Sequence, residues 1–179
     1  SEDTTPIRPA SLYGSTKAAC GNVLGAYARE TGVSAAWARL FFLFGAFDSP
    51  LRLVPSLVRT LGAGQPARCT AGSHLRDFLH VGEAAAALVA LLQSTVTGPV
   101  NIGSGAPMRI GDIARHVAMR VGRPELLTVE EGPAEHALVC ANVTRLRDEV
   151  GWRPGSETVP RLDETIHWWR SPEAAQVKA

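Results

Sequence analysis

The sequence predicts an α/β protein, and two adjoining segments carry that prediction. Residues 11–30 have the spacing of a helix, with apolar or small side chains recurring on one face and Gly32 in the position of a C-terminal cap. Residues 35–44 are a nearly continuous apolar run with Arg39 as the single charge, which is typical of a parallel strand buried on both faces. A helix that leads into such a strand favours stacked layers of helices and strands.

Further helices and strands alternate along the rest of the chain. Ala-rich or amphipathic spacing predicts the later helices, glycine and proline residues mark their ends, and short apolar runs predict the later strands. The tail from Pro172 is expected to fray. The predicted helices cover residues 11–30, 53–61, 81–92, 110–121, 144–150 and 159–170, and the predicted strands cover residues 35–44, 78–81, 100–102 and 138–141.

Composition limits the kinds of partner to expect. A chain of 179 residues with 45% hydrophobic residues is ordinary for one globular domain or slightly more. The net charge of +1 predicts no nucleic-acid partner, and no apolar run is long enough to predict a membrane span. Cys20, Cys69 and Cys140 lie far apart and no Cys/His spacing suits a metal, so we expect no metal site and a cytoplasmic location.

Tyr13 and Lys17 are the candidates for chemistry within residues 11–30. The chain has only two tyrosines, and positions i and i+4 share one face of a helix, so this phenol and this ammonium group point the same way. A nearby cation favours the ionised phenol, which makes Tyr13 a plausible acid/base. The alternative is a surface helix whose tyrosine has no chemical role.

Five stretches, in order and with sensible gaps, carry a resemblance to a known family. They are Pro9-Ala-Ser11-Leu-Tyr13-Gly-Ser-Thr-Lys17, Arg39-Leu-Phe-Phe-Leu-Phe-Gly45, Arg76-Asp77-Phe78-Leu-His80-Val81, Asn101-Ile-Gly103-Ser-Gly105 and Gly151-Trp152-Arg-Pro154. No single stretch is decisive, but together they are specific. Over roughly residues 9–169 the chain resembles the C-terminal half of an extended short-chain dehydrogenase/reductase, in the NAD-dependent epimerase/dehydratase family that modifies nucleotide sugars.

The resemblance implies a role for particular residues. Tyr13 would be the catalytic acid/base, and Lys17 would hydrogen-bond the nicotinamide ribose of NAD or NADP. The strand at Phe41 would lie beside the nicotinamide, so Tyr13, Lys17 and Phe41 are the expected cofactor contacts. Arg76 would bind the diphosphate of the nucleotide sugar, because a guanidinium fork suits phosphate oxygens. Phe42 takes a substrate-binding position where the family usually has Asn, whose hydrogen bond Phe cannot make.

The resemblance covers only part of that family's fold. The family's glycine-rich phosphate-binding loop has no counterpart here, because Gly103-Ser-Gly105 lacks the third glycine. The implied fold is therefore the C-terminal part of a Rossmann-like parallel sheet with a smaller α/β substrate-binding lobe, the N-terminal cofactor-binding half being absent. Residues 1–47 would belong to the Rossmann-like part and residues 48–179 mainly to the lobe, with residues 76–105 returning to the sheet.

The implied function is that of an NAD(P)-dependent epimerase, dehydratase or ketoreductase for a nucleotide sugar, and we expect the 179 residues alone to be inactive. The alternative is a catalytically silent fragment or module that binds a nucleotide sugar or a partner chain through its exposed half-sheet. A homodimer is also expected, since in similar enzymes the helix with Tyr13 pairs with its copy across a two-fold axis. The small residues that permit close approach are Ala18, Ala19, Gly21, Gly25 and Ala26.

Overall fold

The computed structural model describes residues 2, 4–133 and 137–177 and confirms the α/β class. The helices are α1 (Leu12–Thr31), α2 (Leu53–Gly62), α3 (Val81–Gln93), α4 (Ile110–Val121), α5 (Thr144–Asp148) and α6 (Thr158–Trp169), with 3₁₀ turns η1 (Pro124–Leu126) and η2 (Pro172–Gln176). The strands are β1 (Ala36–Leu40), β2 (Phe42–Phe44), β3 (Ala67–Cys69), β4 (Leu75–Arg76), β5 (Phe78–His80), β6 (Gly98–Ile102), β7 (Met108–Arg109), β8 (Leu127–Val129) and β9 (Leu138–Val139).

The helices begin and end where local signals predicted. At the start of α1 the Ser11 hydroxyl accepts a hydrogen bond from the Gly14 N–H at 3.1 Å, which satisfies one of the free donors of the first turn. Gly32, with φ of 74°, ends α1, and Gly122, with φ of 82°, ends α4. Both glycines adopt the left-handed conformation that lets a helix cap its last carbonyls. All six predicted helices are present.

The apolar run at residues 35–44 is not the single strand that its composition predicted. Residues 36–40 form β1, which pairs in parallel with β6, whereas residues 42–44 form β2, which pairs in parallel with β5. The change occurs at Phe41, whose N–H donates to the carbonyl of Ile102, while the next N–H, of Phe42, donates to the carbonyl of Asp77. One apolar segment thus supplies strands to two sheets.

The other strands are short and pair over long sequence distances. β3 pairs in parallel with β8, and β4 lies between β7, which is antiparallel, and β9, which is parallel. Sequence patterns did not reveal β3, β4, β7 or β8. Strands of two or three residues leave too little alternation to detect, because their stability comes from the distant partner.

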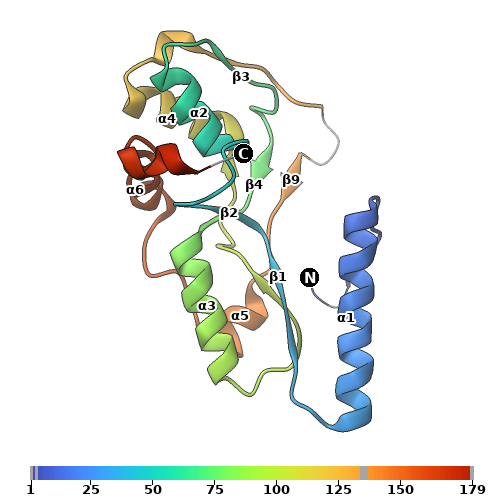
Figure 1. Ribbon diagram of the computed structural model, residues 1–179. Coiled ribbons are helices and arrows are strands. Elements are labelled where there is room, and N and C mark those ends of the chain that lie inside the picture. The colour runs from blue at the N-terminus through green and yellow to red at the C-terminus, as the bar shows by residue number, and fades with distance from the viewer. Residues whose placement is uncertain (1, 3, 134–136, 178–179) are drawn as a thin grey trace.

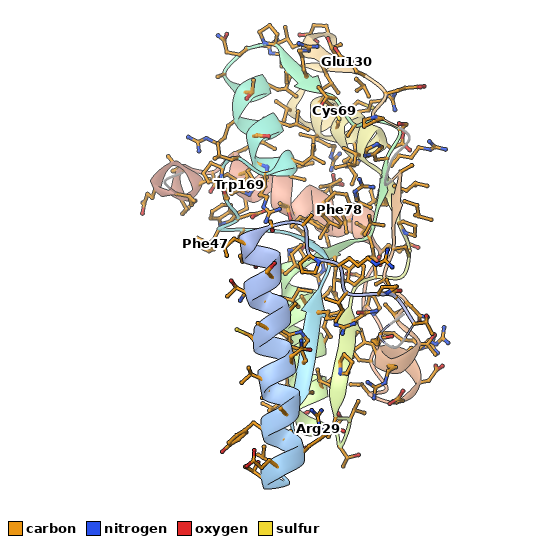
Figure 2. All side chains as sticks on the ribbon, turned by 90° about the vertical axis from the view of Figure 1, so that its right-hand side faces the viewer. Arg29, Phe47, Cys69, Phe78, Glu130 and Trp169 are labelled. Carbon is orange, nitrogen blue, oxygen red and sulfur yellow. The ribbon has the colours of Figure 1, made fainter. Side chains whose placement is uncertain are left out.

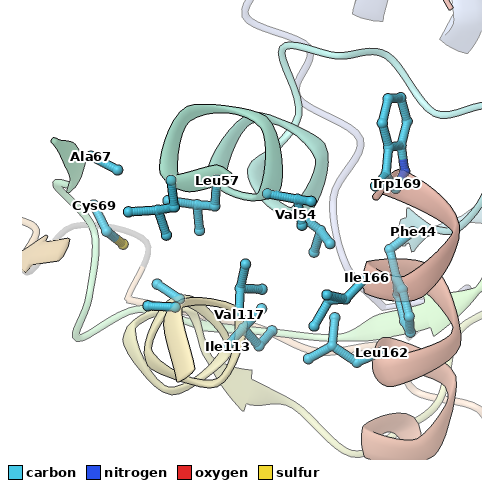
Figure 3. Close-up of a cluster of buried hydrophobic side chains, with 14 of the residues drawn as sticks. Phe44, Val54, Leu57, Ala67, Cys69, Ile113, Val117, Leu162, Ile166 and Trp169 are labelled. Carbon is cyan, nitrogen blue, oxygen red and sulfur yellow. The ribbon is translucent and has the colours of Figure 1, made fainter. Parts of the chain in front are cut away.

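Two hydrophobic cores lie on either side of the β2–β5 pair (Figure 1). The first joins α2, α4 and α6, with Leu57, Val117 and Ile166 at its centre (Figure 3). The second joins α3, α5 and β6. Successive side chains of a strand point to opposite faces, so Phe44 enters the first core and Leu43 packs against the second.

The C-terminal tail is ordered within the described residues, contrary to the expectation of fraying. Residues 172–176 form η2, and Ala174 is buried in the first core. Helix α6 anchors this end, because the buried Trp169 donates its indole N–H to the carbonyl of Gly45 at 3.0 Å. The predicted division at residue 47 into a Rossmann-like part and a substrate lobe stays a prediction. Within the part of the chain described here, no helix is both long and apolar enough to cross a bilayer.

Candidate functional site

Tyr13 and Lys17 lie together at the start of α1. The Lys17 ammonium nitrogen is 5.8 Å from the centre of the Tyr13 ring, as the i, i+4 spacing predicted. Tyr13 is the second residue of α1, where the positive end of the helix dipole also favours an anion. The Tyr13 side chain is 73% exposed, so solvent screens both effects until something covers the pair.

Helix α1 lies along one face of β1 and β6, with its Tyr13 end toward the level of β4 and β9 (Figures 1 and 2). None of its residues is buried. Its inner side is formed by small residues, and a Cβ on Gly21 would come within 3.2 Å of the Trp37 ring. A cleft of about 500 Å³ remains between α1 and the two strands, lined in part by Ala18, Gly25 and Trp37.

This inner position bears on the expectation that small residues of α1 serve a dimer interface. Ala18, Gly21 and Gly25 line the cleft toward β1, whereas Ala19 lies on the outer side of the helix. The outer side instead carries an apolar patch, hereafter the α1 patch. It is formed by Thr16, Ala19, Cys20, Val23, Leu24 and Tyr27. Val23 is 68% exposed and Tyr27 is 56% exposed.

Arg76 and Phe42 meet in a second cleft, of about 380 Å³, on the side of the first core. The Arg76 guanidinium carbon lies 5.8 Å from the centre of the Phe42 ring, and the Phe78 ring packs beside Phe42 at the same centroid separation, 5.8 Å. Arg52 and Arg68 also line this cleft. Its walls are therefore aromatic. Its charged groups are mainly cationic, with Asp48 as a carboxylate among them, so the cleft suits an anionic ligand with a flat or apolar part.

The Arg76 guanidinium is held by neutral acceptors. Its Nη1 donates to the carbonyls of Leu75 at 2.9 Å and Ala137 at 3.3 Å, and its Nη2 lies 2.9 Å from Nδ1 of His74. Among the described residues, Arg76 forms no ion pair with Asp77 or Glu83. The charge of Arg76 is therefore available to an anionic ligand.

The carboxylate of Asp77 is fully buried, and it accepts hydrogen bonds from two backbone segments beside the strand that carries Arg76. It accepts hydrogen bonds from the N–H groups of Ser104 at 2.7 Å, Gly105 at 2.9 Å and Ala141 at 3.0 Å, and from the Ser104 hydroxyl at 2.6 Å. Gly103 passes so close that an added Cβ would lie 2.9 Å from this carboxylate. Asp77 thereby fixes the strand carrying Arg76 to the turn after β6 and to the end of β9.

Glu83 joins α3 to the segment before α6. It is 7% exposed and accepts hydrogen bonds from the Gly155 N–H at 2.9 Å, the Ser156 hydroxyl at 3.1 Å and Arg161 at 3.2 Å. The bond from Gly155 is the main cause that lowers the pKa of Glu83, and Arg161 and Ser156 lower it further. This carboxylate thus has a structural use, because it holds α3 against the segment before α6.

His80 caps the start of α3. Its Nδ1 accepts a hydrogen bond from the Gly82 N–H at 3.2 Å, and its ring meets Phe44 edge to face at 5.5 Å. Burial is the main cause that lowers the pKa of His80, and the positive charge of Arg161 lowers it further. The neutral imidazole is therefore the form that this position favours.

The structure brings some of the expected site residues together and leaves others apart. Tyr13 pairs with Lys17, and Arg76 pairs with Phe42, but neither Tyr13 nor Lys17 lines the cleft that holds Arg76 and Phe42. Phe41 lies at the switch between β1 and β2 and is partly exposed. Sequence reasoning missed His74, although a residue two positions before Arg76 shares its side of an extended segment.

A family model provides the first comparison with known proteins. The model of the NAD dependent epimerase/dehydratase family matches residues 1–103 of this chain. That range contains Tyr13, Lys17, Phe42 and Arg76 and ends directly after β6.

Individual relatives agree with that match. A dTDP-glucose 4,6-dehydratase from Mycolicibacterium smegmatis is 29% identical over 177 residues, which cover 96% of this chain and 54% of that protein. UDP-glucuronic acid decarboxylase 1 from Xenopus tropicalis is 28% identical over 169 residues, which cover 92% of this chain and 40% of that protein. The chain therefore spans about half the length, or less, of these relatives.

A solved structure shows the same fold. The crystal structure of dTDP-glucose 4,6-dehydratase from Bacillus anthracis in complex with NAD superposes with a TM-score of 0.86 at 22% identity, covering 97% of this chain and 56% of that one. The likeness confirms the expected fold class, α/β with Rossmann-like parallel strands, and this chain corresponds to about half of the larger fold.

Proposed function

The chain belongs to the NAD-dependent epimerase/dehydratase family, and from this premise we propose that it carries the acid/base helix and the substrate lobe of an enzyme acting on a nucleotide sugar. The reaction class is epimerisation, dehydration or ketone reduction. The observation that carries the proposal is the Tyr13–Lys17 pair, exposed on one face of α1. The Lys17 ammonium nitrogen lies 5.8 Å from the centre of the Tyr13 ring.

Tyr13, Lys17 and Phe41 fit the nicotinamide end of NAD or NADP. A phenol and an ammonium group on one helix turn offer hydrogen bonds to ribose hydroxyls, and the partly exposed Phe41 offers apolar surface for the nicotinamide. The described residues contain no glycine-rich strand–helix turn that would hold the pyrophosphate. When bound, the nicotinamide supplies hydride exchange with a carbon of the sugar.

Tyr13 is the group of this chain that moves a proton. We infer that its phenol takes a proton from a sugar hydroxyl, or returns one, at the carbon where hydride is exchanged. Lys17 stabilises the phenolate by its charge, as does the N-terminal end of α1. Both effects strengthen once ligands cover the exposed pair and exclude water.

Arg76 is the proposed anchor for the diphosphate of the substrate, and Phe42 forms a wall of the same cleft. The support is the cleft lining described above, which is aromatic and mainly cationic, together with the uncompensated charge of Arg76. The names of the relatives contain dTDP-glucose and UDP-glucuronic acid, both nucleoside-diphosphate sugars. Phe42 packs without donating a hydrogen bond, so we propose that it selects by shape and by contact with apolar or ring surfaces.

A homodimer through the α1 patch is part of this proposal, as is a cytoplasmic location. Val23 and Tyr27 expose apolar surface on the outer side of α1, and no other helix or strand of the described residues lies in front of α1 in Figure 2. A second copy of the same helix would cover matching surface across a two-fold axis, since such interfaces are self-complementary.

The central test is Tyr13→Phe in the intact protein, with Tyr27→Phe as the matched control on the same helix. Loss of acid/base catalysis lowers a rate by about 100- to 10,000-fold, so we expect a loss of that size for Tyr13→Phe and none for Tyr27→Phe. The rate is measured in a single turnover, and circular dichroism checks that the fold is unchanged. Turnover of the Tyr13 variant within about tenfold of the parent contradicts the proposal.

A second candidate function is a catalytically silent module that binds a nucleotide sugar or a partner chain. The observation that favours it is the sheet edge: among the described residues β1 pairs with β6 alone, and a cleft of about 500 Å³ lies beside it under α1. A parent protein that binds nucleoside diphosphates but turns over no nucleotide sugar supports this second function.

A further inference from the structure

His74 connects Arg76 to a loop that lies far away in the sequence. Its Nδ1 is 2.9 Å from Nη2 of Arg76, and its Nε2 is 2.6 Å from the carbonyl oxygen of Pro133. The side chain is only 7% exposed. Both nitrogens of a nearly buried imidazole are therefore in use.

The partners of His74 define where its proton lies. A carbonyl oxygen only accepts hydrogen bonds, so Nε2 must carry the proton and donate it to Pro133. A guanidinium only donates hydrogen bonds, so Nδ1 must present its lone pair to Arg76. The two partners thus select one tautomer of the neutral imidazole, with the proton on Nε2 and the lone pair on Nδ1.

The position of the ring is fixed by close packing. Gly132 passes so near that an added Cβ would lie 2.6 Å from Nε2 of His74, and its N–H donates to the Ser73 hydroxyl at 3.2 Å. On the other side, the His74 carbonyl accepts the N–H of Ile110 at 2.9 Å. A ring held in this way has little freedom, so the direction of its lone pair is also fixed.

A neutral acceptor and a carboxylate differ in how much of the positive charge of Arg76 remains for a ligand. A carboxylate facing Arg76 would orient the guanidinium but would also cancel its charge. His74 orients the guanidinium and leaves the charge intact. The Nε–H of Arg76 and one N–H of its Nη2 find no acceptor among the described residues, so two donors remain for phosphate oxygens.

We propose that His74 is a positioning residue that aims the Arg76 guanidinium at the diphosphate of the substrate without neutralising it. The inference rests on the proposed role of Arg76 as the diphosphate anchor. It assigns to His74 no contact with the substrate and no part in proton transfer.

Two substitutions separate positioning from a purely structural role in the intact protein. In His74→Asn the amide oxygen takes the place of Nδ1, so the acceptor for Arg76 is kept and the bond to Pro133 is lost. In His74→Gln the amide nitrogen takes the place of Nε2, so the bond to Pro133 is kept and the acceptor is lost. Binding of UDP and of dTDP is measured by calorimetry, melting temperatures follow stability, and steady-state kinetics give KM and kcat for a nucleotide sugar that the parent turns over.

We expect His74→Gln to raise the Kd for the nucleoside diphosphate, and the KM, by about tenfold, the size expected for one disturbed hydrogen bond to a charged group. Its kcat should change little, and His74→Asn should bind as the parent does. His74→Asp should weaken binding as well, because its carboxylate would take the place of Nδ1 and neutralise Arg76. Parent-like binding by His74→Gln, or equal weakening in the Gln and Asn variants, overturns the proposal.

Arg76→Ala distinguishes this inference from the proposed function on which it rests. If Arg76→Ala leaves nucleoside diphosphate binding unchanged, the assignment of Arg76 is wrong and the role of His74 falls with it. If Arg76→Ala weakens binding and His74→Gln does not, only the role of His74 is wrong. When Arg76 is already Ala, His74→Gln should cause no further loss, since it acts through Arg76; a further loss contradicts positioning.

Discussion

The carboxylate of Asp77 accepts both the backbone N–H and the hydroxyl group of Ser104, at 2.7 and 2.6 Å, across 27 positions of the sequence. Its other oxygen accepts the N–H groups of Gly105 and Ala141. All of these donors are neutral, so the buried charge is stabilised by hydrogen bonds and by no cation among them. The stability of the protein should therefore respond to the replacement of one carboxylate oxygen of Asp77 by an amide nitrogen.

Asp77→Asn should destabilise the protein by about 2–4 kcal/mol, because an amide nitrogen would face the N–H groups of Gly105 and Ala141 and leave them unpaired. Asp112→Asn is the control, since Asp112 is exposed and should cost less than about 1 kcal/mol. Urea unfolding measures both values. Equal stability of the two variants would show that the Asp77 contacts contribute little.

Arg76→Ala should weaken nucleotide-sugar binding by about one to two decades, since a hydrogen bond to a charged group contributes roughly 1.5–3 kcal/mol. Arg68→Ala is the control within the same cleft. Arg68 is already paired with Glu130 at 2.6 Å, so its loss should change the affinity by less than about threefold. Calorimetry with UDP or dTDP gives both values, and dinucleotide affinity should not change. Loss of dinucleotide affinity in Arg76→Ala would assign this residue to the cofactor instead.

Val23→Glu should convert a dimer into a monomer, because it places a charge at the centre of the α1 patch. Val89→Glu is the matched control, as Val89 is 53% exposed on α3. Light scattering measures the mass, and circular dichroism should show equal helix content. A parent protein that is already monomeric, or a Val23→Glu variant that remains dimeric, would rule out this interface.

His80 should make stability fall as the pH drops below its ordinary pKa of 6.5. Burial and Arg161 lower the pKa in the folded protein, so below 6.5 the unfolded chain binds the proton more readily. Protonation would also remove the acceptor that caps α3 at Gly82.

His80→Asn tests this pH dependence, because Asn keeps a capping oxygen and does not titrate. Melting temperatures are compared from pH 8 down to pH 5.5, and subtraction removes the contribution of the other histidines. The variant should show a shallower fall than the parent. Parallel curves would mean that His80 does not contribute to the pH dependence.

Much of the fold could be predicted because its signals are local. Ser11, Gly32 and Gly122 mark helix ends through bonds within one turn of the chain, and these helices appear where expected. The break at Phe41 could not be predicted in this way. An apolar run looks the same whether it has one partner strand or two, and the choice depends on β5 and β6, which lie far along the sequence.

The site was predictable to a similar degree. The spacing of Tyr13 and Lys17 follows from helix geometry alone, so the structure places them together. The surroundings of Arg76 come from Leu75, His74 and the carbonyl of Ala137, which is 61 positions away. Sequence spacing does not report contacts across such a distance, and the neutral character of these acceptors emerged only from the structure.

The two faces of the β2–β5 pair have a consequence for how this protein can be divided. Phe44 and Phe78 belong to one core, and Leu43 and Leu79 belong to the other, so a single pair of strands is a wall common to both halves. The chain also returns to the second core at β6 and at α5 after forming parts of the first. No single cut therefore yields two pieces with intact interiors, and a substrate lobe from another protein could not be exchanged at one junction. The two halves should melt as one cooperative unit.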